Sequence, residues 1–366
     1  MPSVHRHAVA AALAASLAVA AVAVPTASAR AQSLDLTVGD AGISFGDSRR
    51  VVGLRFNFRD RRMEEVIGVN TTIWYHYEDA VGGKVRGLAI GLPVTGAESI
   101  RGVSWGLGGV GAGEELLGIG VAGLGLGSGG TARGIMVGGL GVGAGGSLRG
   151  LMVGGLGVGA GGNARGAMIG GLAAGVGGNV RGLAIGGLAA GAGGSAQGIA
   201  VGGLAAGAGG SMRGLQVGGL AVGAGGTVTG LSVAGLAVGA GDEVRGLTVA
   251  GLGVGAGRAL RGITLTPGGL GAPLVADLAV GLVGIRAIDV RGAALSAGYV
   301  RIGPNGSLKG VSSGLVTDVR GEHCGLTIGL INIARELRGV QVGLINIAHS
   351  NRAGLKVLPI MNADFR

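Results

Sequence analysis

The stretch RGLQVGGLAVGAGGTV, residues 213–228, decides the fold. It holds six glycines, and each would cost an α-helix about 1 kcal/mol relative to alanine. Its apolar residues alternate with period two over residues 215–217 and again over residues 220–222, which is typical of short β-strands. The glycine clusters at 218–219 and 223–226 predict turns after each strand.

The same pattern recurs along the chain with a constant period. Copies begin at residues 133, 149, 165, 181, 197, 213, 229, 245 and 261, and less regular copies begin at 86, 101 and 117. A fixed period of this length is the signature of stacked repeats that contact only their neighbours. We number the positions of a unit from 1 to 16, so that Arg213 is at position 1 and Val228 at position 16.

Two strands and two glycine turns per unit predict one coil of a narrow, all-β, glycine-rich β-solenoid. The alternation changes parity across Gly218 and Gly219, so a bend there would turn both apolar pieces inward. We therefore expect four aliphatic side chains in the interior: Leu215, Val217, Leu220 and Val222. Val228 and its equivalents Leu148, Val180 and Met212 are expected near the return corner. Because one coil cannot offset its own ordering entropy, hydrogen bonds between coils must stabilise the stack.

The composition agrees with an ordered protein built from small residues. Glycine makes up 88 of 366 residues, while 48% of residues are hydrophobic and 13% charged, so the chain is too apolar for low-complexity disorder. Aromatic residues are only 2% of the chain. Cys324 is the only cysteine, which excludes an internal disulfide framework, and the formal net charge is +10.

The N-terminus predicts export. A short basic start is followed by an apolar run at 8–24 and by small residues around Ala29, which fits a signal peptide at 1–31. The mature chain would begin at Arg30 or Gln32. An uncleaved membrane anchor is the alternative, although the apolar run is rich in alanine and short for a spanning helix.

The remaining segments predict caps and less regular coils. Residues 32–84 hold most of the aromatic residues and read as an N-terminal β cap, followed by the glycine-rich repeats at 85–265. Irregular repeats occupy 266–308. Divergent repeats follow at 309–366, where the segment 355–365, with Pro359 breaking the ladder, is expected to be a C-terminal cap or edge strand.

Two motifs near the C-terminus carry a family resemblance. GLTIGLINIA at 325–334 and GVQVGLINIA at 339–348, followed by NRAGLKVLPIMNADF at 351–365, resemble the leptospiral-type bacterial surface-repeat family. This resemblance implies an exported protein of unknown activity. The glycine-rich units, such as RGLAIGGLAAGAGGS at 181–195, also look like the β-roll head repeats of trimeric autotransporter adhesins.

Arginine recurs at position 1. If the coils stack in register, one edge carries a column interrupted by Gln197 and Thr229; its members are Arg133, Arg149, Arg165, Arg181, Arg213, Arg245 and Arg261. Such a stripe could bind an anionic partner. A solvated face that keeps an apolar protein soluble is the simpler interpretation, since no aromatic residues interleave with the arginines.

Catalytic and cofactor motifs are not evident in the sequence. The pattern GxGxxG recurs with the repeat and predicts turns, and a calcium roll would need an acid in every unit, whereas Asp242 and Glu243 occur in one. His323 and Cys324 are adjacent, so on a strand they would point to opposite faces. His76 and His349 show no metal-ligand spacing. We expect no enzyme activity, cofactor or metal.

These observations favour an exported, non-catalytic repeat protein with a structural or interaction role at the cell surface, at the outer membrane or in the periplasm. The alternative is an outer-membrane transmembrane β-barrel with one strand per unit. The change of parity within each unit and the lack of aromatic girdles argue against it. The expected partners are an anionic envelope polymer or another surface protein, not nucleic acid, and open coil ends would allow self-association.

Overall fold

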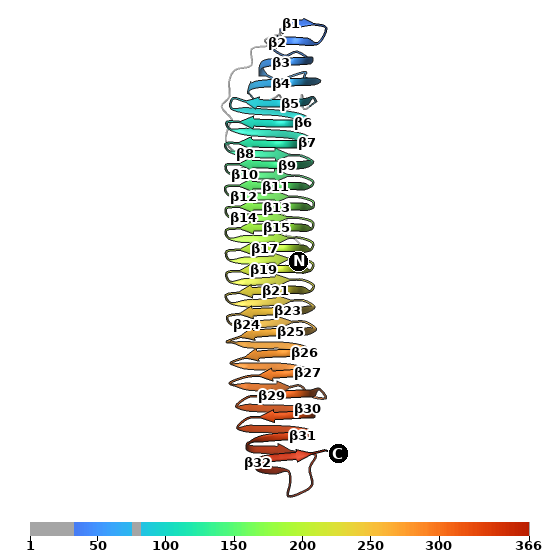
Figure 1. The fold of residues 1–366 in the computed structure, drawn as a ribbon, viewed down its shortest axis with the longest axis vertical. Coiled ribbons are helices and arrows are strands. Elements are labelled where there is room, and N and C mark those ends of the chain that lie inside the picture. The colour runs from blue at the N-terminus through green and yellow to red at the C-terminus, as the bar shows by residue number, and fades with distance from the viewer. Residues whose placement is uncertain (1–32, 75–81, 366) are drawn as a thin grey trace, which may run out of the picture. The chain divides into compact units, whose positions relative to one another are not determined.

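The protein is described by a computed structural model that covers residues 33–74 and 82–365. These residues form β-strands and turns, without a helix among them. The predicted signal peptide at 1–31 lies outside the described residues, and so do Tyr75, His76 and Tyr77. The chain divides into two compact units, residues 1–172 and 173–366, which we describe one at a time. Figure 1 labels most of their strands.

The first unit contains the strands β1 to β13. Their bounds are β1 Leu34–Val38, β2 Ala41–Phe45, β3 Arg50–Arg59, β4 Glu65–Trp74, β5 Lys84–Gly91, β6 Val94–Gly106, β7 Gly109–Ala122, β8 Gly125–Ser128, β9 Thr131–Gly138, β10 Gly141–Ala144, β11 Leu148–Gly154, β12 Gly157–Ala160 and β13 Ala164–Gly170. After the antiparallel pair of β1 and β2, each of the strands pairs in parallel with its counterpart in the next coil.

The second unit contains β14 to β32. The glycine-rich coils comprise β14 Ala173–Val176, β15 Val180–Gly186, β16 Ala189–Ala192, β17 Ala196–Gly202, β18 Ala205–Ala208, β19 Met212–Gly218, β20 Ala221–Ala224, β21 Val228–Ala234, β22 Ala237–Ala240, β23 Glu243–Ala250, β24 Gly253–Ala256 and β25 Ala259–Thr266. The remaining strands are β26 Gly269–Gly281, β27 Gly284–Leu295, β28 Tyr299–Ile302, β29 Ser307–Ser313, β30 Val316–Ile328, β31 Ile331–Ala348 and β32 Val357–Asp364.

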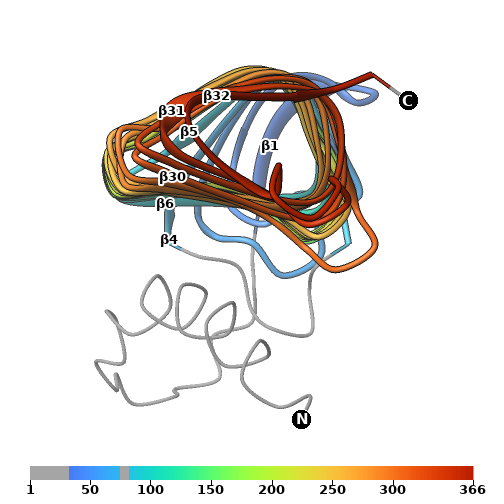
Figure 2. The same ribbon diagram turned by 90° about the horizontal axis from the view of Figure 1, so that it is seen from below.

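One coil consists of a long strand and a short strand, as β19 and β20 illustrate. The long strand spans positions 16 to 6 and the short strand positions 9 to 12, with turns at Gly219 and at Gly225. In the parallel ladders, Gly214 pairs with Gly230 and Val222 with Val238, each one period later. The predicted all-β, glycine-rich solenoid, with one repeat unit per coil, is thus confirmed. Figure 2 shows the coils end-on.

The predicted interior is wrong for three of its four aliphatic residues. Val222 is buried, with 1% of its surface exposed, and Val228 is fully buried as expected. Leu220, in contrast, is 46% exposed, and Leu215 and Val217 lie on the outward side of β19. The interior is instead lined by positions 16, 4, 6, 10 and 12.

Leu215 and Val217 lie outside because side chains alternate between the two faces of the long strand. Its alternation starts at position 16 and runs unbroken to position 6, so a strand that buries Val228 must also bury position 4 and expose positions 3 and 5. The interior is narrow, and small residues therefore fill position 6, where Gly218 stands. Position 4 accepts varied side chains; its buried members include Met136, Met152, Ala184, Gln216, Ser232 and Thr248.

Glycine is required where successive coils approach most closely. At position 2, Gly230 has a φ of 114°, and a Cβ there would lie 2.1 Å from the carbonyl oxygen of Gly214. At position 7, a Cβ on Gly219 would lie 1.8 Å from the carbonyl oxygen of Gly203. At position 11, by contrast, a Cβ on Gly239 would meet nothing within 4 Å. Only some of the glycines are therefore needed for stacking.

A polar network fills the interior of the coil that contains β3, near the β1 end of the first unit. Arg55 occupies position 4 of its coil, is fully buried, and forms an ion pair with Asp60. Its guanidinium also donates a hydrogen bond of 2.9 Å to Asn70 and lies 3.4 Å from Asp47. Charged groups replace apolar packing in this coil, and β1, antiparallel to β2, ends the ladder.

An asparagine ladder fills the interior of the coils next to β32. Asn332 and Asn346, the asparagines of the two GLINIA motifs, are fully buried, and Asn332 stands in the same column as Val222 of the regular coils. The Asn332 amide donates to the Asn346 side chain at 2.8 Å. The edge strand β32 pairs antiparallel to β31, and the register breaks around Pro359, as expected for proline in a ladder.

A matched pair of alanine substitutions tests the steric role of glycine. Gly230→Ala should lower the free energy of unfolding by about 3 kcal/mol or more, because its Cβ meets backbone and its φ is unfavourable. Gly239→Ala should be neutral or stabilise by up to about 1 kcal/mol. Thermal unfolding followed by circular dichroism measures both. Equal effects of the two substitutions would contradict the account.

Candidate interaction surfaces

The arginine column exists in each unit. In the first unit, Arg149 pairs in register with Arg133 on one side and with Arg165 on the other, and all three are exposed. Coils in a parallel ladder are spaced by about 4.8 Å, so their guanidinium groups form a closely spaced positive edge. Within the part of the chain that the structure describes, none of these three arginines forms an ion pair with a carboxylate.

The column of the second unit is interrupted and partly neutralised. Arg181, Gln197, Arg213, Thr229, Arg245 and Arg261 follow one another in register. Glu243, whose side chain is only 1% exposed, forms ion pairs with Arg245, with Arg258 at 3.0 Å and with Arg261 at 3.7 Å. This end of the column therefore carries less net positive charge than the run of Arg133, Arg149 and Arg165. It resembles Arg86 and Arg101 of the first unit, which pair with Glu65 and Glu115.

Asp242, next to Glu243 in the sequence, adds a second carboxylate that pairs with Arg258. Its carboxylate lies 2.7 Å from the Nε of Arg258, and the hydrogen bond from Arg258 holds the pKa of Asp242 below its usual value. From the sequence alone, the occurrence of Asp242 and Glu243 in a single unit argues against a calcium array. Their role as partners of the arginines at position 1 follows from the register, which places Glu243 at position 15, just before Arg245.

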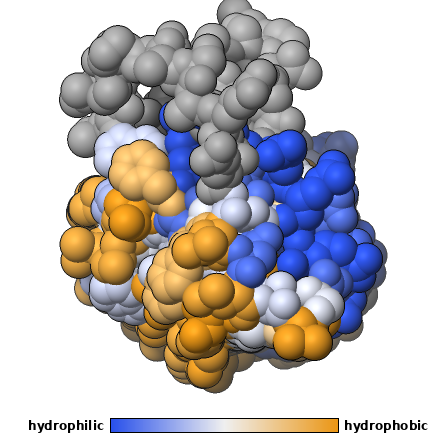
Figure 3. Space-filling view, turned by 90° about the horizontal axis from the view of Figure 1, so that it is seen from above, coloured by the Kyte–Doolittle hydropathy of each residue, from blue (hydrophilic) through white to orange (hydrophobic). Residues whose placement is uncertain are grey.

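An exposed apolar face accompanies the arginine column. We call it the aliphatic face and define it as the outward residues at positions 3 and 5 of the long strands. In the first unit, the members with more than a third of their surface exposed are Ile43, Phe45, Leu54, Phe56, Val103, Trp105, Ile119, Val121, Ile135 and Leu151. Figure 3 looks onto the β1 end and shows hydrophobic residues gathered on one side and hydrophilic residues on the other.

The second unit carries the same aliphatic face. Its exposed members at positions 3 and 5 are Ile199, Leu231, Val233, Leu247, Val249, Ile263, Val311, Ile328 and Val342. In both units a leucine at position 8 adds to the apolar surface at the following corner, as Leu140 (48% exposed) and Leu204 (47%) show. This face was missed at the level of sequence because the same residues were assigned to the interior.

The outer face of the short strands has almost no side chains. Positions 9 and 11 are glycine or alanine, so the backbone of β20, β22 and β24 is nearly bare. A shallow depression of about 490 Å³ lies over these strands, and only alanine, valine and glycine line it. No group there can ionise or act as a nucleophile.

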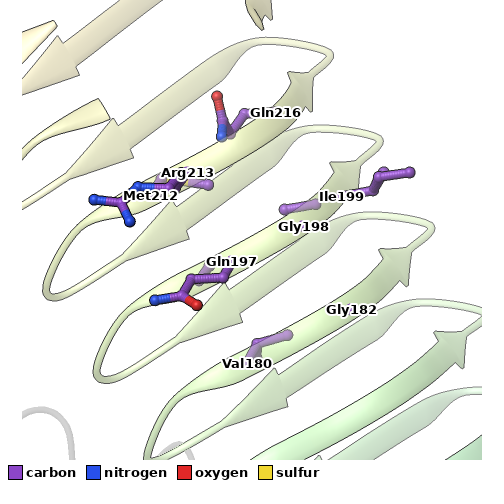
Figure 4. A pocket seen from close by; sticks show the side chains of 10 residues that line it. Val180, Gly182, Gln197, Gly198, Ile199, Met212, Arg213 and Gln216 are labelled. Carbon is purple, nitrogen blue, oxygen red and sulfur yellow. The ribbon is translucent and has the colours of Figure 1, made fainter. Parts of the chain in front are cut away.

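The interior offers no room for a cofactor in the region shown in Figure 4. A cavity of about 10 Å³ lies beside Ala200, where the neighbouring coil places the longer side chain of Gln216. That volume suits about one water molecule. Gln216 accepts a hydrogen bond of 2.9 Å from Ser232, so the polar side chains at position 4 are partly satisfied by one another.

His323 and Cys324 point in opposite directions, as the strand geometry predicts. His323 is fully buried between Leu308 and Leu337 of adjacent coils, and its Nε2 lies 2.7 Å from Thr327 Oγ1. Burial lowers the pKa of His323 to about 4. Burial and the nearby Glu322 raise the pKa of Cys324. Both shifts disfavour a thiolate–imidazolium pair.

Clustered metal ligands and spanning helices are both missing from residues 33–74 and 82–365. No group of three or more His, Cys, Asp or Glu side chains in these segments is placed to hold a metal ion. Within the same ranges, no helix has the length and apolar character that a membrane span requires.

The stacked coils, the narrow interior and the patterned outer faces define the class of this molecule as a glycine-rich β-solenoid repeat protein. Comparison with protein-family models, with curated proteins and with solved structures finds no match to this chain.

The buried histidine predicts a loss of stability in acid. The unfolded chain protonates His323 near pH 6.5, whereas the folded chain does so only near pH 4. The unfolded state therefore binds more protons as pH falls from 6.5, and stability declines by roughly 2–3 kcal/mol by pH 4.5. Above about pH 7.5 this group contributes almost no pH dependence.

His323→Leu isolates the effect, because it continues the leucine column on both sides. Urea unfolding at pH 7.5 and pH 4.5 should show a smaller acid-induced loss in the variant than in the wild-type chain, by about the amount given above. An identical loss in both chains would show that His323 is not the group responsible.

Proposed function

We propose that this chain is an exported, non-catalytic repeat protein of a bacterial cell envelope with an interaction role. The aliphatic face is the observation that carries the proposal. A spacer needs only its interior side chains and its glycine turns, whereas this chain repeats exposed leucine, isoleucine and valine from coil to coil. Large exposed apolar patches mark sites of association in soluble proteins.

Two sequence features support the envelope location. The apolar run at 8–24, with small residues near Ala29, fits an export signal. The GLINIA motifs resemble the leptospiral-type surface-repeat family, whose members are exported. The Asn332 and Asn346 ladder gives these motifs a structural meaning, since it places both asparagines in the interior of adjacent coils.

A non-catalytic role is supported by His323 and Cys324, since neither is activated as a base or a nucleophile. The shifts of the pKa values of His323 and Cys324 both favour the neutral forms, and the two side chains lie on opposite sides of β30. The depression over the short strands is lined by groups without acid–base chemistry. Recognition by repeated surface groups is what these faces can offer.

Cell fractionation with mass measurement of the N-terminus tests the proposal. We expect the protein in the envelope or surface-washed fraction of the native cell, with its chain starting at Arg30 or Gln32. A cytoplasmic marker protein, followed in the same fractions, controls for lysis. Recovery of a chain that begins at Met1 in the cytoplasmic fraction would contradict the proposal.

A further inference from the structure

In the first unit, the aliphatic face also includes aromatic side chains. Phe45 and Phe56 stack with ring centroids 5.5 Å apart, and Trp105 stands further along the column at position 5. No phenylalanine or tryptophan among the described residues is buried: the most covered of them, Trp105, is still 39% exposed. The largest apolar side chains of this protein thus lie on its surface.

This face is extensive and is not part of the protein's own core. Positions 3 and 5 recur over the coils from Ile43 to Leu151 and beyond, which at about 4.8 Å per coil gives a strip roughly 40 Å long and about 10 Å wide, or ~400 Å². The core lies on the other side of the same strands. An apolar strip of this size on a single unit is in the range associated with binding sites.

Arginines that pair with no carboxylate of the described residues border one end of the strip. Along the rest of it, position 1 holds Ala41, Val52, Ile67 and Leu117, together with Arg86 and Arg101, which form ion pairs with Glu65 and Glu115. Position 1 lies two residues before position 3 on the same outward side of the strand, about 7 Å away. Arg133, Arg149 and Arg165 stand there without carboxylate partners in the described residues, next to Ile135 and Leu151. An apolar strip with three such arginines at one end matches a surface that is apolar inside and anionic at its boundary.

We propose that the aliphatic face of the first unit binds the surface of an anionic lipid bilayer. The apolar columns enter the boundary between headgroups and acyl chains, and the arginine column contacts the headgroup phosphates. Trp105 and Phe56 occupy the depth that aromatic side chains prefer at membrane interfaces. The inference rests on the proposed function, because it names the partner of the same face.

Charge favours a lipid surface over a second copy of the chain. The formal net charge is +10, so two copies repel each other, whereas an anionic bilayer attracts each copy. Three arginines near an anionic surface account for an affinity gain on the order of 100-fold.

The two tryptophans of the chain provide an intrinsic probe. Trp74 and Trp105 are both in the first unit and both exposed, at 40% and 39%. Vesicles of 30% phosphatidylglycerol in phosphatidylcholine, added to the full purified chain, should shift their fluorescence to shorter wavelength. Brominated acyl chains should quench the emission. Unchanged fluorescence at vesicle concentrations that saturate a positive control would overturn the proposal.

Matched variants separate the aliphatic face from general effects. Ile119→Ser with Ile135→Ser should weaken vesicle co-sedimentation at least tenfold. Gly127→Ser with Gly143→Ser adds the same hydroxyls on the short-strand face, where a Cβ meets no atom closer than 4.0 Å, and should bind as the wild-type chain does. Circular dichroism confirms that each variant is folded. Equal binding by both pairs would overturn the proposal.

Two further measurements test the contribution of the arginines to lipid binding and the alternative that a second copy of the chain covers the aliphatic face. Replacing Arg133, Arg149 and Arg165 with glutamine should remove most of the preference for anionic over pure phosphatidylcholine vesicles. Sedimentation velocity of the free chain should show a monomer. A dimer that the Ile119 and Ile135 substitutions dissociate, without vesicle binding, would assign the face to a second copy and overturn the lipid proposal.

The experiments distinguish failure of the lipid-binding proposal from failure of the proposed function. If the chain is found in the envelope but does not bind vesicles, the proposed interaction role stands and lipid is excluded as its partner. A chain found in the cytoplasm that binds vesicles would contradict export and leave the lipid-binding face.

Discussion

The close approach of successive backbones is the constraint on which this structure depends. Each coil hydrogen bonds to the next through parallel ladders, with pairs such as Leu220 N to Leu204 O at 2.8 Å continuing through the turns. At positions 2 and 7 the coils come so near that a Cβ would lie 2.1 Å and 1.8 Å from a carbonyl oxygen, as at Gly230 and Gly219. Glycine at these positions permits the stacking, and the fixed period of the sequence follows from it.

A narrow interior follows from the same constraint. With tight turns at both ends of the strands, the inside holds three medium-sized side chains per coil, at positions 16, 4 and 10, such as Leu148, Met152 and Val158. Glycine and alanine at positions 6 and 12 complete the packing of that coil. The leucine, isoleucine and valine columns at positions 3 and 5 lie outside because the alternation of the long strand turns these positions outward. Serine or threonine would fit there as well.

The sequence was sufficient for the architecture because glycine spacing and strand alternation are local signals. The period, a turn after each strand, the return-corner residue Val228 and the edge strand with Pro359 were all predicted from it. The turns themselves lie at 219–220 and 225–227, slightly later than the predicted 218–219 and 223–226. The buried pair of Arg55 and Asp60 near the N-terminal end was not. An ion pair in an interior is set by neighbours distant in sequence and leaves no periodic trace.

Hydrophobicity alone could not predict which side chains of the long strand point into the interior and which point out. Position 4 carries methionine, alanine, glutamine and serine in different copies, which looks like a solvent-facing position, whereas position 3 is leucine or isoleucine in most copies. The parity that Val228 sets along the strand is the signal that gives the correct assignment. The arginine column was predicted by register, but its relation to the aliphatic face required knowing which side of the strand faces out.

Cysteine accessibility tests this inside–outside assignment most directly. In a chain in which serine replaces Cys324, Leu215→Cys and Val222→Cys place thiols on the outer and inner sides of one coil. The account predicts that a maleimide labels the thiol at position 215 of the chain rapidly in the folded protein, and that the thiol at 222 reacts only after unfolding. Protection at 215 together with rapid labelling at 222 would contradict it.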